Sequence, residues 1–93
     1  MQNIETCRKE IDALDDQILS LLNNRMEIVK AIGRLKQTTG TAIYRPEREK
    51  EILDRLKALN QGALNAEAIE AIFLEVFAFF SFEFRSSLPF SLT

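Results

Sequence analysis

The sequence predicts an all-α fold of three helices per chain, with one very long N-terminal helix, assembled as a homodimer. Apolar residues recur at steps of three and four along most of the chain, which is typical of helices that pack along one face. Glycine-containing segments interrupt this spacing twice, so helices are expected over 4–36, 46–60 and 65–87, with a loop over 37–45. At 93 residues the chain is expected to form a single domain, 1–93.

The first helix is predicted from a heptad-like apolar stripe that no proline interrupts. A helix of this length runs roughly 48 Å at ~1.5 Å per residue. A compact chain of 93 residues has a radius of gyration of about 12–13 Å and is too small to cover such a rod. We therefore expect the stripe to pack against a second copy of the chain. The stripe consists of Ile4, Cys7, Ile11, Leu14, Ile18, Leu21, Ile28, Ile32 and Leu35.

The second and third helices are predicted from their end signals and their apolar residues. Pro46 suits the first position of a helix, Gly62 follows the end of the second helix, and Asn65 can cap the third. Residues 77–84 (FAFFSFEF) alternate partly as a strand would, but no second strand is predicted to pair with them. We assign them to the third helix and expect their aromatic surface to be buried at the dimer interface. The inward residues are expected to be Ile52, Leu53, Leu56 and Leu59, and then Ile69, Ile72, Phe73, Val76, Phe77 and Phe80.

The composition excludes several classes of protein. Hydrophobic and charged contents of 46% and 28% are typical of a globular domain, and a net charge of −2 gives no reason to expect nucleic acid. No apolar run reaches the length of a membrane span, and the N-terminus lacks the apolar run of a signal peptide. Together with the single cysteine, Cys7, these features predict a cytoplasmic protein without membrane contact.

The absence of histidine narrows the possible chemistry. It removes the commonest general base and the commonest metal ligand, and a single cysteine cannot build a thiolate zinc site. If the chain is an enzyme, its reaction is expected to need neither a metal nor proton transfer near neutral pH. No cofactor is expected.

Arg25 stands where the apolar stripe should continue between Leu21 and Ile28. A buried cation without a partner is strongly destabilising, so an anion should meet it. The pattern leaves two interpretations equally open: an ion pair with a carboxylate of a neighbouring helix, or a site for an anionic ligand. Arg8 and Lys36 flank the same stripe 28 residues apart, so one chain cannot bring both to one small molecule. Taken singly, each is typical of a solvated surface residue.

Four polar residues of the later helices are further candidates. Arg48 and Glu49 are expected on the inward face of the second helix, although a first-turn glutamate beside a salt-bridged arginine is the structural alternative. Ser81 and Arg85 lie one turn apart and can face the same space. Alone, Ser81 is typical of close helix packing.

The sequence contains four motifs: Arg8-x-Glu10-Ile11-Asp12-x-Leu14-Asp15, Leu21-Leu22-x-x-Arg25, Ile32-Gly33-x-x-Lys36 and Tyr44-x-Pro46-x-Arg48-Glu49. Together they resemble the all-helical (AroQ-type) chorismate mutases, most closely the mutase domain at the start of bifunctional chorismate mutase–prephenate dehydratases. The likeness covers about residues 4–85. It implies an intertwined homodimer with active sites built from both subunits, and the Claisen rearrangement of chorismate to prephenate in phenylalanine and tyrosine biosynthesis.

The same resemblance implies a role for each charged residue. Arg25 would hold one carboxylate of chorismate, and Arg8 of the partner chain would hold the other. Lys36 would bridge a carboxylate and the ether oxygen, while Glu49 would accept a hydrogen bond from the ring hydroxyl. The remaining contacts would come from Arg48, which completes the positive pocket or orients Glu49, from Ser81 at a carboxylate, from the backbone N–H of Arg45, and from Arg85 as a donor to the ether oxygen.

Two positions depart from the family pattern. Arg45 stands where aspartate is frequent, and Arg85 stands where glutamine or a protonated glutamate usually donates to the ether oxygen. These departures keep open a catalytically impaired dimerisation or regulatory module of the same fold. An isochorismate-pyruvate lyase, which shares the fold, is a further alternative. A fused or lost prephenate dehydratase domain is also compatible with the resemblance.

Overall fold

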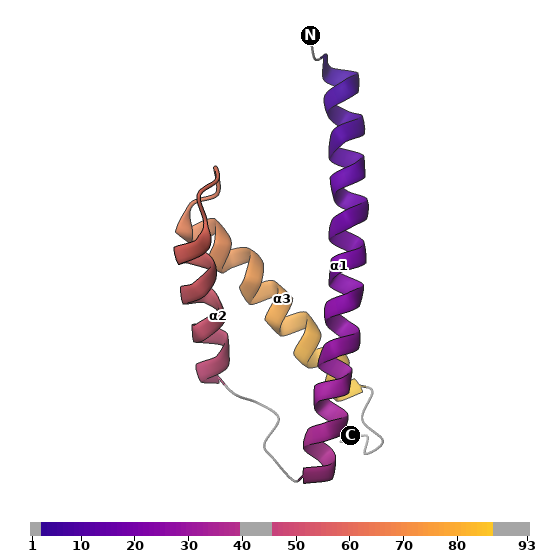
Figure 1. Cartoon of the computed structure of the whole chain (residues 1–93), viewed down its shortest axis with the longest axis vertical. Helices are drawn as coiled ribbons and strands as arrows, with labels where there is room; N and C mark the ends of the chain where they lie inside the picture. The colour runs from indigo at the N-terminus through magenta and orange to yellow at the C-terminus, as the bar shows by residue number, and fades with distance from the viewer. Residues whose placement is uncertain (1–2, 40–45, 87–93) are drawn as a thin grey trace.

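Within residues 3–39 and 46–86 the chain folds into three α-helices (Figure 1). The computed structural model describes residues 3–39 and 46–86, with side-chain positions for 3–36 and 46–80. Helix α1 spans Ile4–Thr39, α2 spans Pro46–Leu59 and α3 spans Ala66–Ser86. Since these ranges contain helices and no strand, the all-α prediction is confirmed, including the helical assignment of the aromatic segment. In the same part of the chain, no helix has the length and apolar character needed to cross a bilayer.

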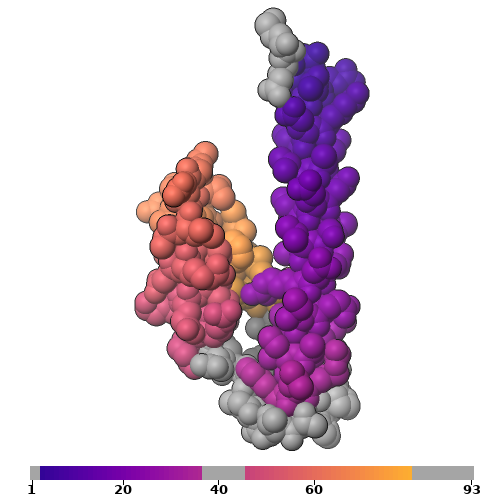
Figure 2. Space-filling model, viewed as in Figure 1, coloured from indigo at the N-terminus to yellow at the C-terminus, as the bar shows by residue number. Residues whose placement is uncertain are grey.

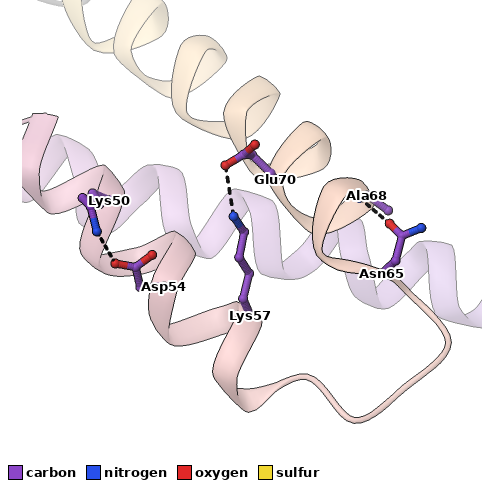
Figure 3. Close-up of polar contacts among 6 residues, drawn as sticks. All are labelled: Lys50, Asp54, Lys57, Asn65, Ala68 and Glu70. Atoms are coloured by element: carbon purple, nitrogen blue, oxygen red, sulfur yellow. Dashed lines mark hydrogen bonds and ion pairs between the residues drawn. The ribbon is translucent and has the colours of Figure 1, made fainter.

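The helix ends follow local signals in the sequence. Asn65 Oδ1 accepts a hydrogen bond from the backbone N–H of Ala68 at 2.7 Å, which confirms the predicted cap of α3 (Figure 3). Asn3 Oδ1 caps α1 in the same way, accepting from the N–H of Thr6 at 2.8 Å. The predicted boundaries of α2 and α3 are correct to one residue, but α1 continues three residues beyond position 36. The rest of the expected loop, 40–45, lies outside the described residues.

Helix α3 connects the other two helices. It packs against both α1 and α2, whereas α1 and α2 do not pack against each other within the described ranges. Figure 1 shows α3 running obliquely from the end of α2 to the C-terminal half of α1. Lys57 Nζ lies 3.1 Å from Glu70 Oε1 and adds a partly exposed ion pair between α2 and α3 (Figure 3). The apolar cluster between these helices consists of Ile52, Leu53 and Phe77, with Leu56 and Phe73 packed against it.

Some of the residues expected to be inward or at the dimer interface are placed differently. Leu59, the last residue of α2, is 67% exposed, and Ile72 of α3 is 48% exposed, because neither is covered by the other described helices. Phe77 and Phe80 are only 6% exposed within a single chain, so the expectation that a dimer interface buries them was wrong. The aromatic side chains of residues 82 and 84 lie outside the described ones.

The predicted stripe of α1 remains exposed in the single chain. Its large apolar side chains are 45–70% exposed, and Figure 2 shows the N-terminal half of α1 standing free of α2 and α3. The radius of gyration, 16.8 Å, exceeds the value of about 12–13 Å for a compact chain of this length. The side of α1 that the chain itself covers is offset from the stripe and includes Arg25, Met26, Val29 and Gly33. Arg25 therefore lies between the covered side and the exposed stripe.

Candidate active site

Arg25 is half-buried on α1, with its guanidinium over two phenyl rings of α3. The guanidinium carbon Cζ lies 4.7 Å from the ring centroid of Phe80 and 5.7 Å from that of Phe77. Both distances fall within the range of cation–π contacts. The ion pairs seen among the described side chains, Lys50–Asp54 and Lys57–Glu70, do not involve Arg25. The intrachain ion pair considered for Arg25 is thus not found in this part of the chain.

Arg48 adds a second positive charge to this region from the first turn of α2. Burial, and after it the positive charge of Arg48, lower the pKa of the Arg25 guanidinium below its usual value. Arginine nevertheless remains protonated in proteins, so two like charges act on each other here. The Arg48 side chain itself is exposed and not inward as predicted, whereas Glu49 beside it is half-buried. The arrangement is electrostatically suited to an anion, which would relieve this repulsion.

Lys36 shares one face of α1 with Arg25. Eleven residues separate them, which brings Lys36 to within about 20° of Arg25 around the helix and about 16 Å along it. Two long side chains on one face can therefore approach the same ligand from its two ends. Lys36 is half-buried, as expected for a residue beside the covered side of α1.

Arg8 lies far from this face. It precedes Arg25 by seventeen residues of continuous helix, which corresponds to about 25 Å along α1 and a rotation of about 100°. Its side chain is exposed. The Arg8 of the same chain therefore cannot join Arg25 and Lys36 at one small molecule.

The last three predicted site residues fall outside the described side chains. Arg45 lies in the segment 40–45, and the side chains of Ser81 and Arg85 lie beyond residue 80. The backbone of α3 continues as a helix through this point, so Ser81 follows Phe80 by about 100° around the axis. Of the described α3 side chains, the Phe80 ring lies nearer to the Arg25 guanidinium than the Phe77 ring does.

Comparison with known proteins identifies the scaffold that carries this geometry. A sequence model of the family described as "Chorismate mutase type II" matches residues 7–80. The chain belongs to the chorismate mutase type II family. It is 39% identical over 80 residues to a bifunctional chorismate mutase/prephenate dehydratase of Aquifex aeolicus, covering 82% of this chain and 22% of that protein. The chain thus spans only about a fifth of the length of the bifunctional relatives it matches.

Solved chorismate mutases superpose on this fold over most of its length. A chorismate mutase from Thermus thermophilus superposes with a TM-score of 0.83 at 39% identity, covering 86% of this chain and 91% of that one. The Helicobacter pylori chorismate mutase, solved in complex with prephenate, superposes with a TM-score of 0.80 at 38% identity, covering 92% and 97% of the two chains. The resemblance to the helical chorismate mutases and the predicted fold class are therefore confirmed.

In this member of the chorismate mutase family, the sequence did not indicate which residues contact the side chain of Arg25. Phe77 and Phe80 were predicted as core residues, and they are buried as core residues are. Their spacing of three places both rings on one face of α3, which was visible in the sequence. That this face meets Arg25 depends on how α3 crosses α1, and helical periodicity carries no information about that crossing. Among the described side chains, no group of three potential metal ligands gathers at this site or elsewhere.

Proposed function

We propose that this chain catalyses the Claisen rearrangement of chorismate to prephenate. The observation that carries the proposal is Arg25: a half-buried guanidinium on aromatic rings, beside the charge of Arg48, on the scaffold of the chorismate mutase type II family. A site of this kind suits a carboxylate of the substrate. The complex of the Helicobacter pylori relative with prephenate supports the same class of ligand.

The reaction is a unimolecular rearrangement, so catalysis consists of orientation and electrostatic stabilisation. Arg25 and the Arg8 of a partner chain hold the two carboxylates, which keeps chorismate in its compact reactive conformer. Negative charge develops on the ether oxygen as its bond to carbon breaks. Lys36 donates to that oxygen and stabilises the transition state more than the ground state, while Glu49 accepts from the ring hydroxyl.

Four further contacts complete the proposed site. Arg48 contributes positive potential and orients Glu49, and Arg45 offers its backbone N–H near the ring hydroxyl. Ser81 assists a carboxylate. Arg85 is the proposed second donor to the ether oxygen. Because arginine stays protonated, turnover should show no steep fall across neutral pH, as it would if a protonated glutamate served there.

The proposed active form is an intertwined homodimer. The exposed apolar stripe runs from Ile4 to Leu35, along most of α1, and gives a second copy of the chain a long apolar face to cover. Since Arg8 cannot reach Arg25 within one chain, a partner copy is the natural source of the second carboxylate contact. A cytoplasmic location belongs to the same proposal and agrees with the single cysteine.

The test is the loss of the ultraviolet absorbance of chorismate in the presence of purified protein, with prephenate confirmed by acid conversion to phenylpyruvate. Turnover is expected for the wild type, and Lys36→Ala should nearly abolish it while the protein stays folded. Lys50→Ala is the matched control, because Lys50 is an exposed lysine of α2 paired with Asp54. A folded dimer that binds chorismate without forming prephenate would contradict the proposal and favour the impaired module. Isochorismate should not be cleaved to release pyruvate.

A further inference from the structure

We propose that Phe80, together with Phe77, is a positioning residue that fixes the plane of the Arg25 guanidinium for a carboxylate ligand. The inference rests on the proposed function, since it concerns how Arg25 meets the substrate. The proposal gives a functional role to two rings that, from their spacing in the sequence, would be ordinary core residues. Three features support the proposal: the contact between the guanidinium and the rings, the packing that holds the rings in place, and the direction in which the N–H groups of Arg25 can meet a carboxylate.

The contact supplies electrostatic compensation that Arg25 does not receive from a described carboxylate. The faces of phenyl rings carry partial negative charge, and a guanidinium is flat and weakly hydrated, so the two stack favourably. At 4.7 and 5.7 Å, the Phe80 and Phe77 rings lie close enough to offset part of the cost of burying Arg25 beside Arg48. Neither ring neutralises the charge, so Arg25 keeps its affinity for an anion.

The rings are themselves held in place by the core. Phe77 belongs to the buried cluster with Ile52 and Leu53 of α2, and its ring centroid lies 6.2 Å from that of Phe73. The Phe80 ring is buried and contacts the ring of Phe79 edge to face at a centroid distance of 6.2 Å. The two rings thus connect the packing of α2 and α3 to a side chain of α1, although α1 and α2 do not pack directly within the described ranges.

In the proposed arrangement the guanidinium stacks on the face of the nearer ring, that of Phe80, so this ring determines the plane of the Arg25 N–H groups. The five donors of arginine point outward in that plane, where a carboxylate can accept two parallel hydrogen bonds. Without the rings, Arg25 would sample several rotamers and would bind the carboxylate in the correct plane only part of the time. The loss would show mainly in substrate binding, because Arg25 holds the carboxylate in the ground state as well as in the transition state.

The decisive comparison uses two substitutions of Phe80. Phe80→Met keeps an apolar side chain of similar length without a ring face, and Phe80→Tyr keeps the ring face. With the dimer and the melting temperature checked for both, Phe80→Met should raise KM about five- to tenfold with a smaller change in kcat, whereas Phe80→Tyr should remain close to wild type. Equal losses in both variants, or faster turnover in Phe80→Met, would overturn the proposal, the latter because the ring would then obstruct the ligand.

A spectroscopic measurement tests the contact without relying on turnover. In the ligand-free wild type, the ring currents of Phe80 and Phe77 should shift the Nε–H proton of Arg25 upfield, with the resonance assigned through Arg25→Lys. The shift should disappear in Phe80→Met and persist in Phe80→Tyr. An unshifted Arg25 resonance in the wild type would refute the positioning contact even if the enzyme is active. A shifted resonance in a protein without turnover would refute the proposed function and leave the contact established.

Discussion

Arg25→Met tests whether the guanidinium serves a ligand or the fold. Methionine is unbranched, comparable in length and able to lie against the rings of Phe77 and Phe80, but it carries no charge. Two unit charges ~4 Å apart interact by about 4 kcal/mol at an effective dielectric constant of ~20. A loss of that size from transition-state binding corresponds to a fall in kcat/KM of about a thousandfold, since each ~1.4 kcal/mol is a factor of ten.

The fold should tolerate the same substitution. Arg25→Met removes a partly desolvated charge and its repulsion from Arg48, which favours folding. It also removes two cation–π contacts, each worth roughly 0.5–1 kcal/mol at a partly exposed site. Because these effects oppose each other, the free energy of unfolding should change by less than about 1 kcal/mol, or a few degrees in Tm.

The assay is therefore paired: chorismate turnover, and thermal or urea unfolding of the same preparation. Arg55→Met is the matched control, because Arg55 is an exposed arginine of α2. Its turnover and stability should both match the wild type. Turnover of Arg25→Met within about tenfold of the wild type would refute the role of Arg25 in ligand binding. A loss of more than about 3 kcal/mol of stability would instead show that Arg25 is chiefly structural.

Three further predictions concern the dimer, a helix cap and an exposed ion pair. Ile18 belongs to the stripe and is 52% exposed in the single chain. Ile18→Glu should weaken self-association, measured by sedimentation, at least about a hundredfold, because both copies would bury a charge. An unchanged dimer would contradict the proposed interface. Asn65→Ala should lower the free energy of unfolding by about 1 kcal/mol without affecting kcat, and Asn65→Asp, which can still cap α3, should remain near the wild type. The hydrogen bond from Lys50 lowers the pKa of Asp54 in the folded chain. The Lys50–Asp54 pair therefore contributes to stability above the pKa that Asp54 has in the unfolded chain, and this contribution is lost as the pH falls through the pKa of Asp54 in the folded chain. The stability difference between the wild type and Asp54→Asn should consequently shrink in acid, and a difference that is constant with pH would count against the pair.

The fold could be predicted where the signals are local to the chain. Pro46 and Asn65 fix the starts of two helices through backbone chemistry that needs no tertiary contact, and both starts are correct to one residue. The end of α1 was placed too early because residues 37–39 contain no breaker, and the first glycine after them is Gly40. A helix continues until its sequence stops it, so the prediction should have extended to that glycine.

The covered side of α1 could not be predicted, because α1 carries two neighbouring apolar surfaces. Spacing alone identified the stripe of Leu21 and Ile28, which a single chain leaves exposed. It did not identify the adjacent surface of Met26 and Val29, which the chain itself covers. Periodicity shows that a residue faces a partner, but it does not show whether that partner is another helix of the chain or a second copy.

Arg25 lies between these two surfaces. This position explains why the sequence singles out Arg25 but does not identify the two phenyl rings that contact it. On the side of the stripe, Arg25 is a cation in an apolar seam, which the sequence shows directly. On the covered side, it is a guanidinium held by Phe77 and Phe80, which requires α3 to cross α1 at this level. A residue on such a border can be supported by its own chain and still present its donors toward the face that a second copy would cover. If that copy brings its Arg8, dimerisation and completion of the site are a single event, because neither chain holds both arginines at one ligand.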